Sequence, residues 1–397
     1  MVDLLAGAKV KVIANTTFFF ESQRDAGLGY IEKLLKLHAE LAAQDTAIPG
    51  KTANDALPRM GTVLAEAEQT LNTDRQLAGS MQRAGNVVLP MVFRHLAEPQ
   101  GNPDQPLPGY VAANSMAGPG SAAALPPPGI FPLYPIAELG SVAAGIGHLN
   151  ADIDVDGAVR AEPLLVRYYD KVFPSLSVLV AARSLNLGIT DIKPAWGDSL
   201  QLGKLRVRTD SELRMHTFFY ADRDGRPPFQ VDSFFDVISG KVPAAKYRDK
   251  IVLIGATAAG LGTAQVTPVS PATAPVLTLA HTVSSILGEH FFVTPSWGIW
   301  VQFGVFLAVA LYLIIVLPRL KAGVAAVVSL AIGVLLLGAH FSLMVTQLMW
   351  IQLMGATVLL AVGYAALTTK RFLVTERGKE KSDANSAESN RMLGIAY

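Results

Sequence analysis

The sequence predicts an α/β domain with a mixed sheet, followed by three transmembrane helices. Strand-like and helix-like segments alternate through residues 1–296. Three apolar runs then occupy residues 297–317, 322–343 and 348–367, and none of them contains Lys, Arg, Asp or Glu. Each run is about 20 residues long, which is what an α-helix needs to cross roughly 30 Å of hydrocarbon. Buried helices of a soluble protein are the alternative, but they rarely stay apolar on every side for so long.

Basic residues in the short connections predict the orientation of this anchor. The first connection carries Arg319 and Lys321, the second (residues 344–347) carries no charge, and Lys370 and Arg371 follow the third run. Basic residues in short loops mark the cytoplasmic side. We therefore expect residues 1–296 to be extracytoplasmic and residues 368–397 to form a cytoplasmic tail.

Three tryptophans agree with this orientation. Trp297 and Trp300 begin the first run, and Trp350 stands near the start of the third. All three then fall at the outer membrane interface, where amphipathic rings are enriched. The lipid bilayer is thus an expected partner.

The first elements of the domain follow from local patterns. A helix end and four longer elements are expected, and together they suggest an α/β unit with neighbouring strands. In chain order they are the end of a helix at Val2–Ala6, a strand at Lys9–Asn15, a helix at Ile31–Ala43, a capped helix from Asp74 to Gly85 and a strand at Asn86–Phe93.

The middle of the domain opens with residues 98–135, a Pro-, Gly- and Ala-rich stretch that predicts a long surface loop. Two β-rich runs then flank Asp156-Gly157, a strong hairpin signal. An apolar helix at Pro174–Asn186 and several short strand-like runs within Ser199–Tyr220 follow.

The last elements before the anchor are a short helix, a strand, a loop and a helix. Asp232–Ser239 reads as a helix with an Asp N-cap and Gly240 just beyond its end. Lys250–Gly255 predicts a buried strand, Ala256–Pro275 a Gly/Thr/Pro loop, and Val276–Leu287 a helix.

Composition excludes several classes of function. Residues 1–296 hold 25 Lys and Arg against 28 Asp and Glu, so they lack the basic excess of a nucleic-acid surface. The chain has no cysteine, which excludes thiol catalysis, disulfides and thiolate metal sites. The seven histidines are scattered and no Gly-x-Ser-x-Gly elbow is present. We therefore expect no enzyme, no catalytic residue and no cofactor.

Two motifs imitate binding sites. Asp152, Asp154 and Asp156 begin a calcium-loop pattern, but Pro163 stands where a bidentate Glu is needed, so a solvated hairpin is favoured and no metal is expected. Gly255–Gly262 follows a strand like a phosphate cradle, yet it lacks the Lys-Ser/Thr of a P-loop. A ligand-lining loop and a purely structural loop remain open, since ligands bind at the carboxyl ends of such strands.

The membrane runs contain few polar residues. Gln302, His340 and Gln352 all fall close to the expected outer interface, which favours interfacial placement over a functional role at depth. Gly355 and Gly363 lie two turns apart on one helix face and allow close helix contact. A packing role and an interface between copies stay open there; we expect a homodimer through the membrane helices.

Four segments in order resemble a bacterial family. They are AGAKVKVIANTTFFF at Ala6–Phe20, AGNVVLP at Ala84–Pro90, DVDGAVRAEPLLV at Asp154–Val166 and KIVLIGATAAGLG at Lys250–Gly262. With the three closing helices, the chain is similar to the second class of CHASE domains, the extracytoplasmic sensors of cyclases, histidine kinases and Ser/Thr kinases. It departs from that pattern at Thr263, where the family usually has Asp, and at Val276–His281, where the family reads close to VEIHAN.

The resemblance implies the sensory and membrane module of a signalling receptor that binds an extracytoplasmic ligand or protein and relays the signal to a cytoplasmic effector. The effector, a Ser/Thr kinase or cyclase, is not in this sequence. We expect ligand-lining residues in the segment from Thr257 to Ser270, namely Thr257, Gly260, Gly262, Thr263, Thr267 and Ser270. A structural membrane protein or transport subunit with an external partner-binding domain is the alternative.

Both ends of the sequence raise a further expectation. The family normally has a membrane helix upstream of the first strand. Asn390–Tyr397 fits the opening of a tetratricopeptide repeat apart from Asn in the Trp position. We therefore expect a fragment of a longer receptor.

Overall fold

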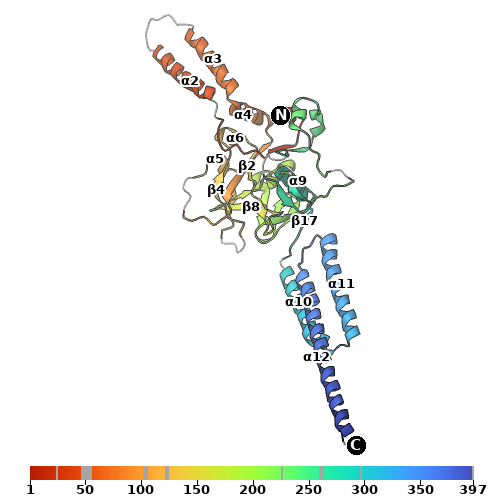
Figure 1. Ribbon diagram of the computed structural model, residues 1–397. Coiled ribbons are helices and arrows are strands. Elements are labelled where there is room, and N and C mark those ends of the chain that lie inside the picture. The colour runs from red at the N-terminus through yellow and green to blue at the C-terminus, as the bar shows by residue number, and fades with distance from the viewer. Residues whose placement is uncertain are drawn as a thin grey trace. The chain divides into compact units, whose positions relative to one another are not determined.

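The computed structural model divides the chain into two units, Met1–Phe291 and Phe292–Tyr397. It describes residues 1–23, 26–45, 56–101, 106–120, 125–224, 227–258, 263–295 and 297–395. The first unit contains several small sheets and helices, and the second contains three long apolar helices (Figure 1). The expected fold class is confirmed.

A mixed five-stranded sheet forms the centre of the first unit. β14 (Ile251–Ile254), β1 (Val12–Asn15), β2 (Val87–His95) and β5 (Gly145–His148) are parallel neighbours in that order, and β4 (Ile130–Leu133) pairs antiparallel with the end of β2. β1 is almost fully buried because it lies between two neighbours, which fits its run of Val12, Ile13 and Ala14. β14 is only half-buried, so the expectation of a buried strand is corrected to an edge strand.

Helices cover both faces of this sheet. On one face α1 (Val2–Gly7), α4 (Thr73–Ala84) and α6 (Ala137–Gly140) contribute to a core with Ile13, Val87 and Leu89. Side chains alternate along a strand, so Val88 points to the opposite face. There Gly145 lies between Val88 and Leu179 of α7 (Leu176–Ser184), and α7 packs on α9 (Pro275–Gly288).

Capping residues at its two ends determine where α4 begins and ends. Gly85 closes it in the left-handed conformation at φ +65°, as predicted. Its N-cap is Asn72, whose Oδ1 accepts from the Arg75 amide at 2.9 Å, so the predicted start at Asp74 is two residues late. Asp74 instead accepts a hydrogen bond from the Gln23 amide at 2.7 Å.

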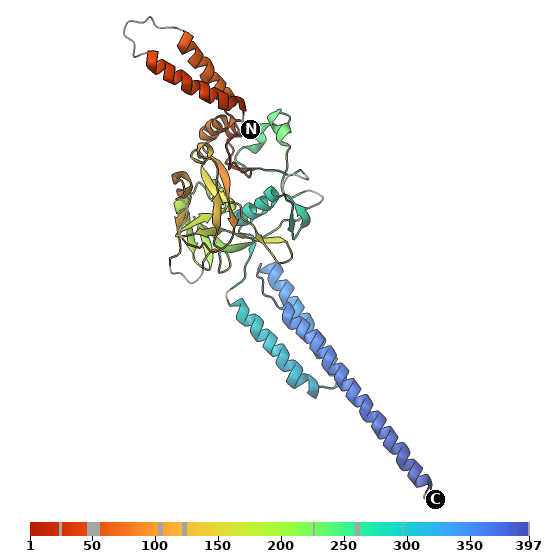
Figure 2. The ribbon, with the colours of Figure 1, turned by 60° about the vertical axis from the view of Figure 1, so that its left-hand side comes forward.

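A helical arm precedes α4. α2 (Ala26–Asp45) contains the predicted helix, and α3 (Ala56–Leu71) packs beside it (Figures 1 and 2). The sequence pattern did not predict α3, because its apolar positions are diluted by Ala, Thr and Glu.

The predicted surface loop at residues 98–135 is structured in part. It contains α5 (Gly109–Ala112), β3 (Met116–Ala117) and β4. Val111 is fully buried in a cluster with Met91, Phe93 and Phe173. The segment therefore contributes Val111 to the core, while its Leu125 and Phe131 side chains are exposed.

Small antiparallel sheets carry the rest of the unit. The strands are β6 (Asp152–Ile153), β7 (Val159–Pro163), β8 (Leu165–Tyr168), β9 (Lys171–Pro174), β10 (Ile192–Ala195), β11 (Ser199–Leu202), β12 (Leu205–Arg208), β13 (Arg214–Thr217), β15 (Gln265–Thr267), β16 (Ser270–Thr273) and β17 (Phe291–Phe292). Their orders are β17-β13-β7-β6, β3-β9-β8, β10-β11-β12 and β15-β16. The β6–β7 hairpin turns at Asp156-Gly157 as predicted, with Gly157 at φ +82°.

The acidic residues of that hairpin bind an arginine. Arg160 reaches Asp154 at 2.6 Å and Asp156 at 2.5 Å. The hydrogen bond from Arg160 lowers the pKa of Asp156. Within the described ranges, no group of three or more His, Asp or Glu side chains is arranged to hold a metal ion.

Three short helices complete the unit: α8 (Phe234–Ile238), η1 (Ile189–Asp191) and η2 (Ala244–Tyr247). The predicted Asp232 cap of α8 is wrong, because the N-cap is Ser233. Asp232 instead accepts hydrogen bonds from Lys246 at 2.7 Å and Tyr247 at 2.8 Å, and these lower its pKa.

The second unit is the helical bundle. Its three candidate spans are Gly298–Arg319, α11 (Ala322–Thr346) and the apolar part of α12 (Met354–Ile395). The first span consists of α10 (Gly298–Leu311), the π-helical turn η3 (Tyr312–Val316) and the 3₁₀ turn η4 (Leu317–Arg319). Residues 348–353, predicted to begin the third helix, precede it in an irregular connection. α12 then continues without a break to Ile395, within the predicted tail.

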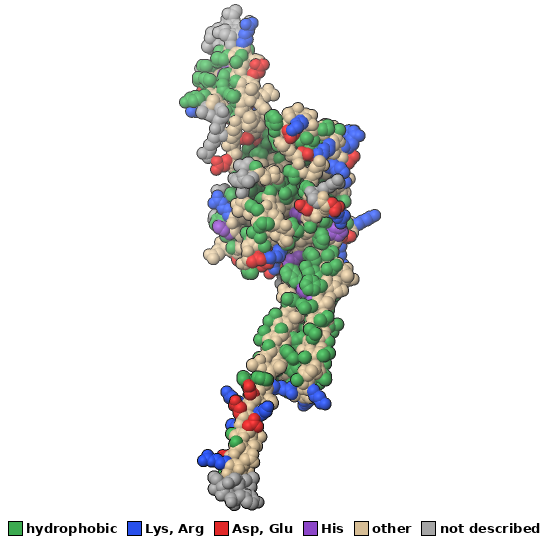
Figure 3. Space-filling model, turned by 45° about the vertical axis from the view of Figure 1, so that its right-hand side comes forward, with side chains coloured by type: hydrophobic (Ala, Val, Ile, Leu, Met, Phe, Trp, Pro, Cys, Tyr) green, Lys and Arg blue, Asp and Glu red, His purple; other side chains and the backbone are tan. Residues whose placement is uncertain are grey.

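Contacts within the bundle place the tryptophans at one end of it and the basic residues at the other. The Trp350 amide donates to Val293 just before α10, so the tryptophans flank one end. At the other end Arg371 donates to the Leu320 carbonyl at 3.1 Å, and Figure 3 shows basic side chains gathered where the tail leaves the apolar helices. Gly363 packs against Leu313 of the same chain, whereas nothing lies within 4 Å of a side chain added at Gly355.

Two glycines of β5 provide a test of the sheet–helix packing. A Cβ at Gly147 would lie 2.8 Å from the backbone nitrogen of Leu176, whereas the nearest atom to one at Gly145 would be Leu179 Cδ1 at 3.4 Å. We predict that Gly147→Ala lowers the free energy of unfolding by about 2 kcal/mol, because α7 must shift. Gly145→Ala should change it by less than about 1 kcal/mol. Denaturant unfolding of the full chain measures both; equal losses would contradict the packing.

Candidate functional site

The order of the parallel strands points to one edge of the central sheet. The chain passes from β1 to β2 and β5 on one side, and the last strand, β14, lies on the other side of β1. In open α/β sheets, ligands bind where the strand order reverses in this way, at the carboxyl ends of the strands. Asn15 and Ile254 are paired at those ends, so the candidate site is formed by the segments that follow them.

Thr16 and Gly255 join these two segments. The Thr16 amide and hydroxyl both donate to the Ile254 carbonyl, at 2.9 and 3.1 Å. A Cβ at Gly255 would collide with Thr16 Oγ1 and would lie 2.7 Å from Val276 Cβ. Gly255 therefore allows β1, β14 and the start of α9 to meet without a gap.

An aromatic pair follows β1 and was missed in the sequence analysis. The rings of Phe18 and Phe20 stack with centroids 4.8 Å apart, and Phe18 is 44% exposed. Phe19, between them, packs against the core on the α1, α4 and α6 face of the sheet. The run TTFFF directly after a buried strand was the available signal. An exposed stacked pair at this edge is suited to contact the flat or apolar part of a ligand.

The predicted ligand-lining residues fall into three groups. Thr257 and Thr263 are exposed, and Thr257 follows β14 at the candidate edge. Thr267 and Ser270 belong to the β15–β16 hairpin, a feature the predicted loop lacked, and Thr267 Oγ1 donates to the Ser270 carbonyl at 3.1 Å. Gly260 and Gly262 lie outside the described residues.

The hairpin residues are engaged in the fold. Thr267 is 6% exposed, and its hydroxyl also lies 2.8 Å from the Thr273 hydroxyl. Thr257 and Thr263 are therefore the predicted residues among the described ones whose side chains are open to a ligand.

α9, which begins beside this edge, carries a polar face that contacts the segment Thr217–Tyr220. The Phe218 amide donates to Ser285 Oγ, and Ser285 Oγ lies 3.1 Å from the Phe218 carbonyl. The Tyr220 amide donates to His281 Nδ1 at 3.1 Å, and the Thr217 and Thr282 hydroxyls are 3.3 Å apart. α9 is thus fixed to the strand end Thr217–Tyr220 by directional bonds as well as apolar packing.

Burial shifts the titration of groups around α9. His281 is 4% exposed between the rings of Phe219, Tyr220 and Phe229, and burial lowers its pKa to about 4. The imidazole is therefore neutral, with Nδ1 as acceptor. Burial raises the pKa of Glu162, whose carboxyl accepts from Ser177 at the start of α7.

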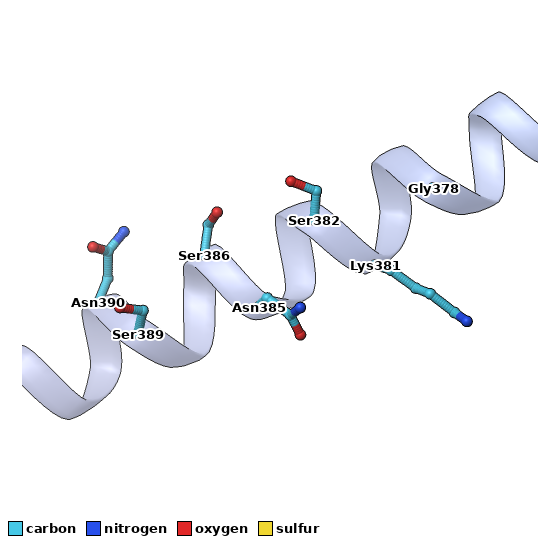
Figure 4. Close-up of a pocket in the computed structure, with 7 residues that line it drawn as sticks. All are labelled: Gly378, Lys381, Ser382, Asn385, Ser386, Ser389 and Asn390. Atoms are coloured by element: carbon cyan, nitrogen blue, oxygen red, sulfur yellow. The ribbon is translucent and has the colours of Figure 1, made fainter.

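The tail helix carries a shallow polar hollow. Its lining residues come from one face of α12: Gly378, Lys381, Ser382, Asn385, Ser386, Ser389 and Asn390 (Figure 4). A hollow on one exposed helix cannot enclose a ligand, so it is the surface of the helix and not a second site.

Comparison with known families decides the identity. The model of the CHASE2 domain matches residues 1–317. The chain belongs to the CHASE2 family. The match covers the whole first unit and most of the first candidate span, so this CHASE2 chain carries a sensor domain joined to candidate membrane helices. The match ends before Asn390, and the tetratricopeptide expectation stays without support. No curated protein and no solved structure matches the chain.

The buried His281 predicts a pH dependence. Its pKa is about 4 in the folded CHASE2 domain and near 6.5 when unfolded, so the unfolded state binds the proton first. The contribution to stability is therefore full above pH 6.5 and is lost as the pH falls towards 4. Between pH 7.5 and 5 this loss is about 2 kcal/mol, or roughly 3 °C in Tm for a unit of this size.

Thermal unfolding of the full chain and of His281→Asn at both pH values checks this. Asn keeps an acceptor near Nδ1 without the titration, so its Tm should fall less on acidification. His290→Asn, at an exposed histidine beyond the same helix, is the control and should behave like the parent. An unchanged pH response in His281→Asn would contradict the assignment.

Proposed function

We propose that this chain is the sensory and membrane module of a bacterial transmembrane receptor. Residues 1–296 form the extracytoplasmic sensor, residues 297–367 hold the three membrane spans, and residues 368–397 enter the cytoplasm from the inner membrane. A ligand or protein contacts the edge formed by β1 and β14, which Thr257, Thr263 and Phe18 line; Gly260 and Gly262, the other candidates of this loop, lie outside the described residues. Membership of a sensor-domain family supports this reading.

The position of α9 is the observation that carries the proposal. Val276 at its start contacts Gly255 at the candidate edge, and Glu289, just past its end, lies nine residues before the first span at Gly298. A shift of the edge therefore reaches the membrane segment through one helix. A ligand acts on this path when it binds two positions of α9 with different free energies.

In this proposal α12 carries the signal from the membrane spans to the cytoplasmic tail. This helix runs from Met354 to Ile395, so its apolar part and its charged part form one rigid rod. We propose that it transmits a rotation or shift to a cytoplasmic effector, a Ser/Thr kinase or a nucleotide cyclase in a longer receptor. The chemistry of catalysis then belongs to the effector and not to these residues.

A transport subunit would need polar residues paired at depth in the bundle. The hydroxyls of Tyr312 and Ser329 lie 2.7 Å apart there. This neutral pair joins the first span to the second, which fits helix packing in a signalling anchor.

Membrane topology tests the proposal. We predict that a reporter active only outside the cytoplasm is active when fused after residue 296 and inactive after residue 381. An export helix added before Met1 makes the outcome independent of how the chain is delivered. A second reporter, active only in the cytoplasm, should give the opposite pattern at the two positions. Cytoplasmic activity at residue 296 would contradict the sensor assignment.

A further inference from the structure

The α2–α3 arm has two apolar faces, and α3 covers one of them. On that face Leu28 is 7% exposed, and His38 Nε2 lies 2.7 Å from the Leu57 carbonyl. Gly61 of α3 is so close that a Cβ there would lie 2.6 Å from the His38 ring. The contact between the two helices is therefore tight.

The other face of α2 is uncovered. It consists of Tyr30, Leu34, Leu37 and Leu41, which are 68, 46, 50 and 40% exposed. We call these four residues the arm stripe; hydrophobic side chains are visible on the arm surface in Figure 3. Their spacing of four, three and four residues places them on one side of the helix, in the pattern by which helices pack against each other. Four large apolar side chains in such a row indicate a binding surface.

Charged residues beside the arm stripe indicate which partner binds this face of α2. Lys33 and Glu40 are exposed, seven residues apart, and therefore on the same flank of the stripe. The Lys33 ammonium lies 5.4 Å from the Tyr30 ring centroid, next to the stripe. When a second α2 helix lies antiparallel, Tyr30 faces Leu41 and Leu34 faces Leu37. Lys33 then faces Glu40 of the second copy, twice by symmetry.

A parallel pair is less favourable. It would stack Tyr30 on Tyr30 and leave Lys33 about 10 Å along the helix axis from Glu40 of the second copy, so the two opposite charges would not meet. The antiparallel arrangement satisfies the requirement of a twofold interface, in which residue i contacts j and j contacts i. Self-complementary charge thus favours a second copy of this chain over an unrelated protein.

We propose that the arm is a self-association surface. Two copies pair their arm stripes with antiparallel α2 helices, and the two hairpins form a four-helix bundle. This interface is separate from the membrane helices, where Gly363 is occupied by Leu313 of its own chain. The arm would then set the distance between two sensor domains, whatever their ligand.

Cysteine pairs test the geometry, because the chain has no cysteine of its own. Tyr30→Cys and Leu41→Cys are made in two differently tagged full-length chains, which are co-expressed and oxidised in isolated membranes. We expect a mixed disulfide between the two tags. Tyr30→Cys alone should give none, since the two copies of position 30 lie about 16 Å apart in an antiparallel pair. That exceeds the reach of a disulfide.

Exchanging the charges of Lys33 and Glu40 tests whether the arm stripe binds a second copy of this chain. Lys33→Glu should reduce the mixed disulfide yield and weaken association roughly tenfold, because two attractive pairs become repulsive. Lys33→Glu with Glu40→Lys should restore it. Lys36→Glu makes the same change at an exposed position outside the stripe and should leave the yield unchanged.

Three outcomes would overturn the proposal. One is a disulfide from Tyr30→Cys alone that equals the mixed yield, which indicates a parallel pair. Another is the absence of any disulfide while a water-soluble maleimide fails to label the thiol of Tyr30→Cys, which assigns the stripe to lipid or another protein. The third is a double charge exchange that fails to recover what Lys33→Glu loses.

Discussion

The attachment of α9 to the strand end Thr217–Tyr220 is the interaction on which the organisation of this protein depends. Ser285 both accepts from the Phe218 amide and lies within hydrogen-bond distance of its carbonyl, and His281 accepts from the Tyr220 amide. A buried hydrogen bond that loses its partner costs about 1–3 kcal/mol, so these bonds favour one registration of the helix. α9 packs on α7, which in turn packs on the central sheet, and it precedes the membrane segment. These bonds therefore hold the last helix of the first unit to the rest of that unit.

Local signals predicted much of the fold. The three apolar runs, the turn at Asp156-Gly157 and the closure of α4 at Gly85 each depend on residues close together in sequence, and the structure confirms them. The pairing of β4 with β2 and the β15–β16 hairpin was not predictable in this way. Both lie in Pro-rich segments, and their pairing partners supply the stability that local propensity lacks.

In the candidate site, too, some features follow from residues close together in sequence and others depend on distant pairing. The sequence places Thr257 after a strand, and the strand order puts it at the candidate edge, the position at which open α/β sheets in general bind ligands. Thr267 and Ser270 were grouped with it by distance along the chain, yet their hydroxyl and carbonyl close a hairpin. Phe18 could not be assigned to this edge from the sequence, because the edge itself depends on the pairing of β1 with a strand about 240 residues later. The Asp232 cap failed for a related reason: Lys246 and Tyr247 compete for its carboxyl.

Amide hydrogen exchange on the full chain in lipid nanodiscs tests the central role of α9 most directly. If α9 is fixed as described, its amides exchange as slowly as those of β1 and β2. Ser285→Ala then accelerates exchange in α9 and in Thr217–Tyr220 together, while the α2–α3 arm is unaffected. Fast exchange of α9 in the parent chain, or acceleration of α9 without Thr217–Tyr220, would contradict the account.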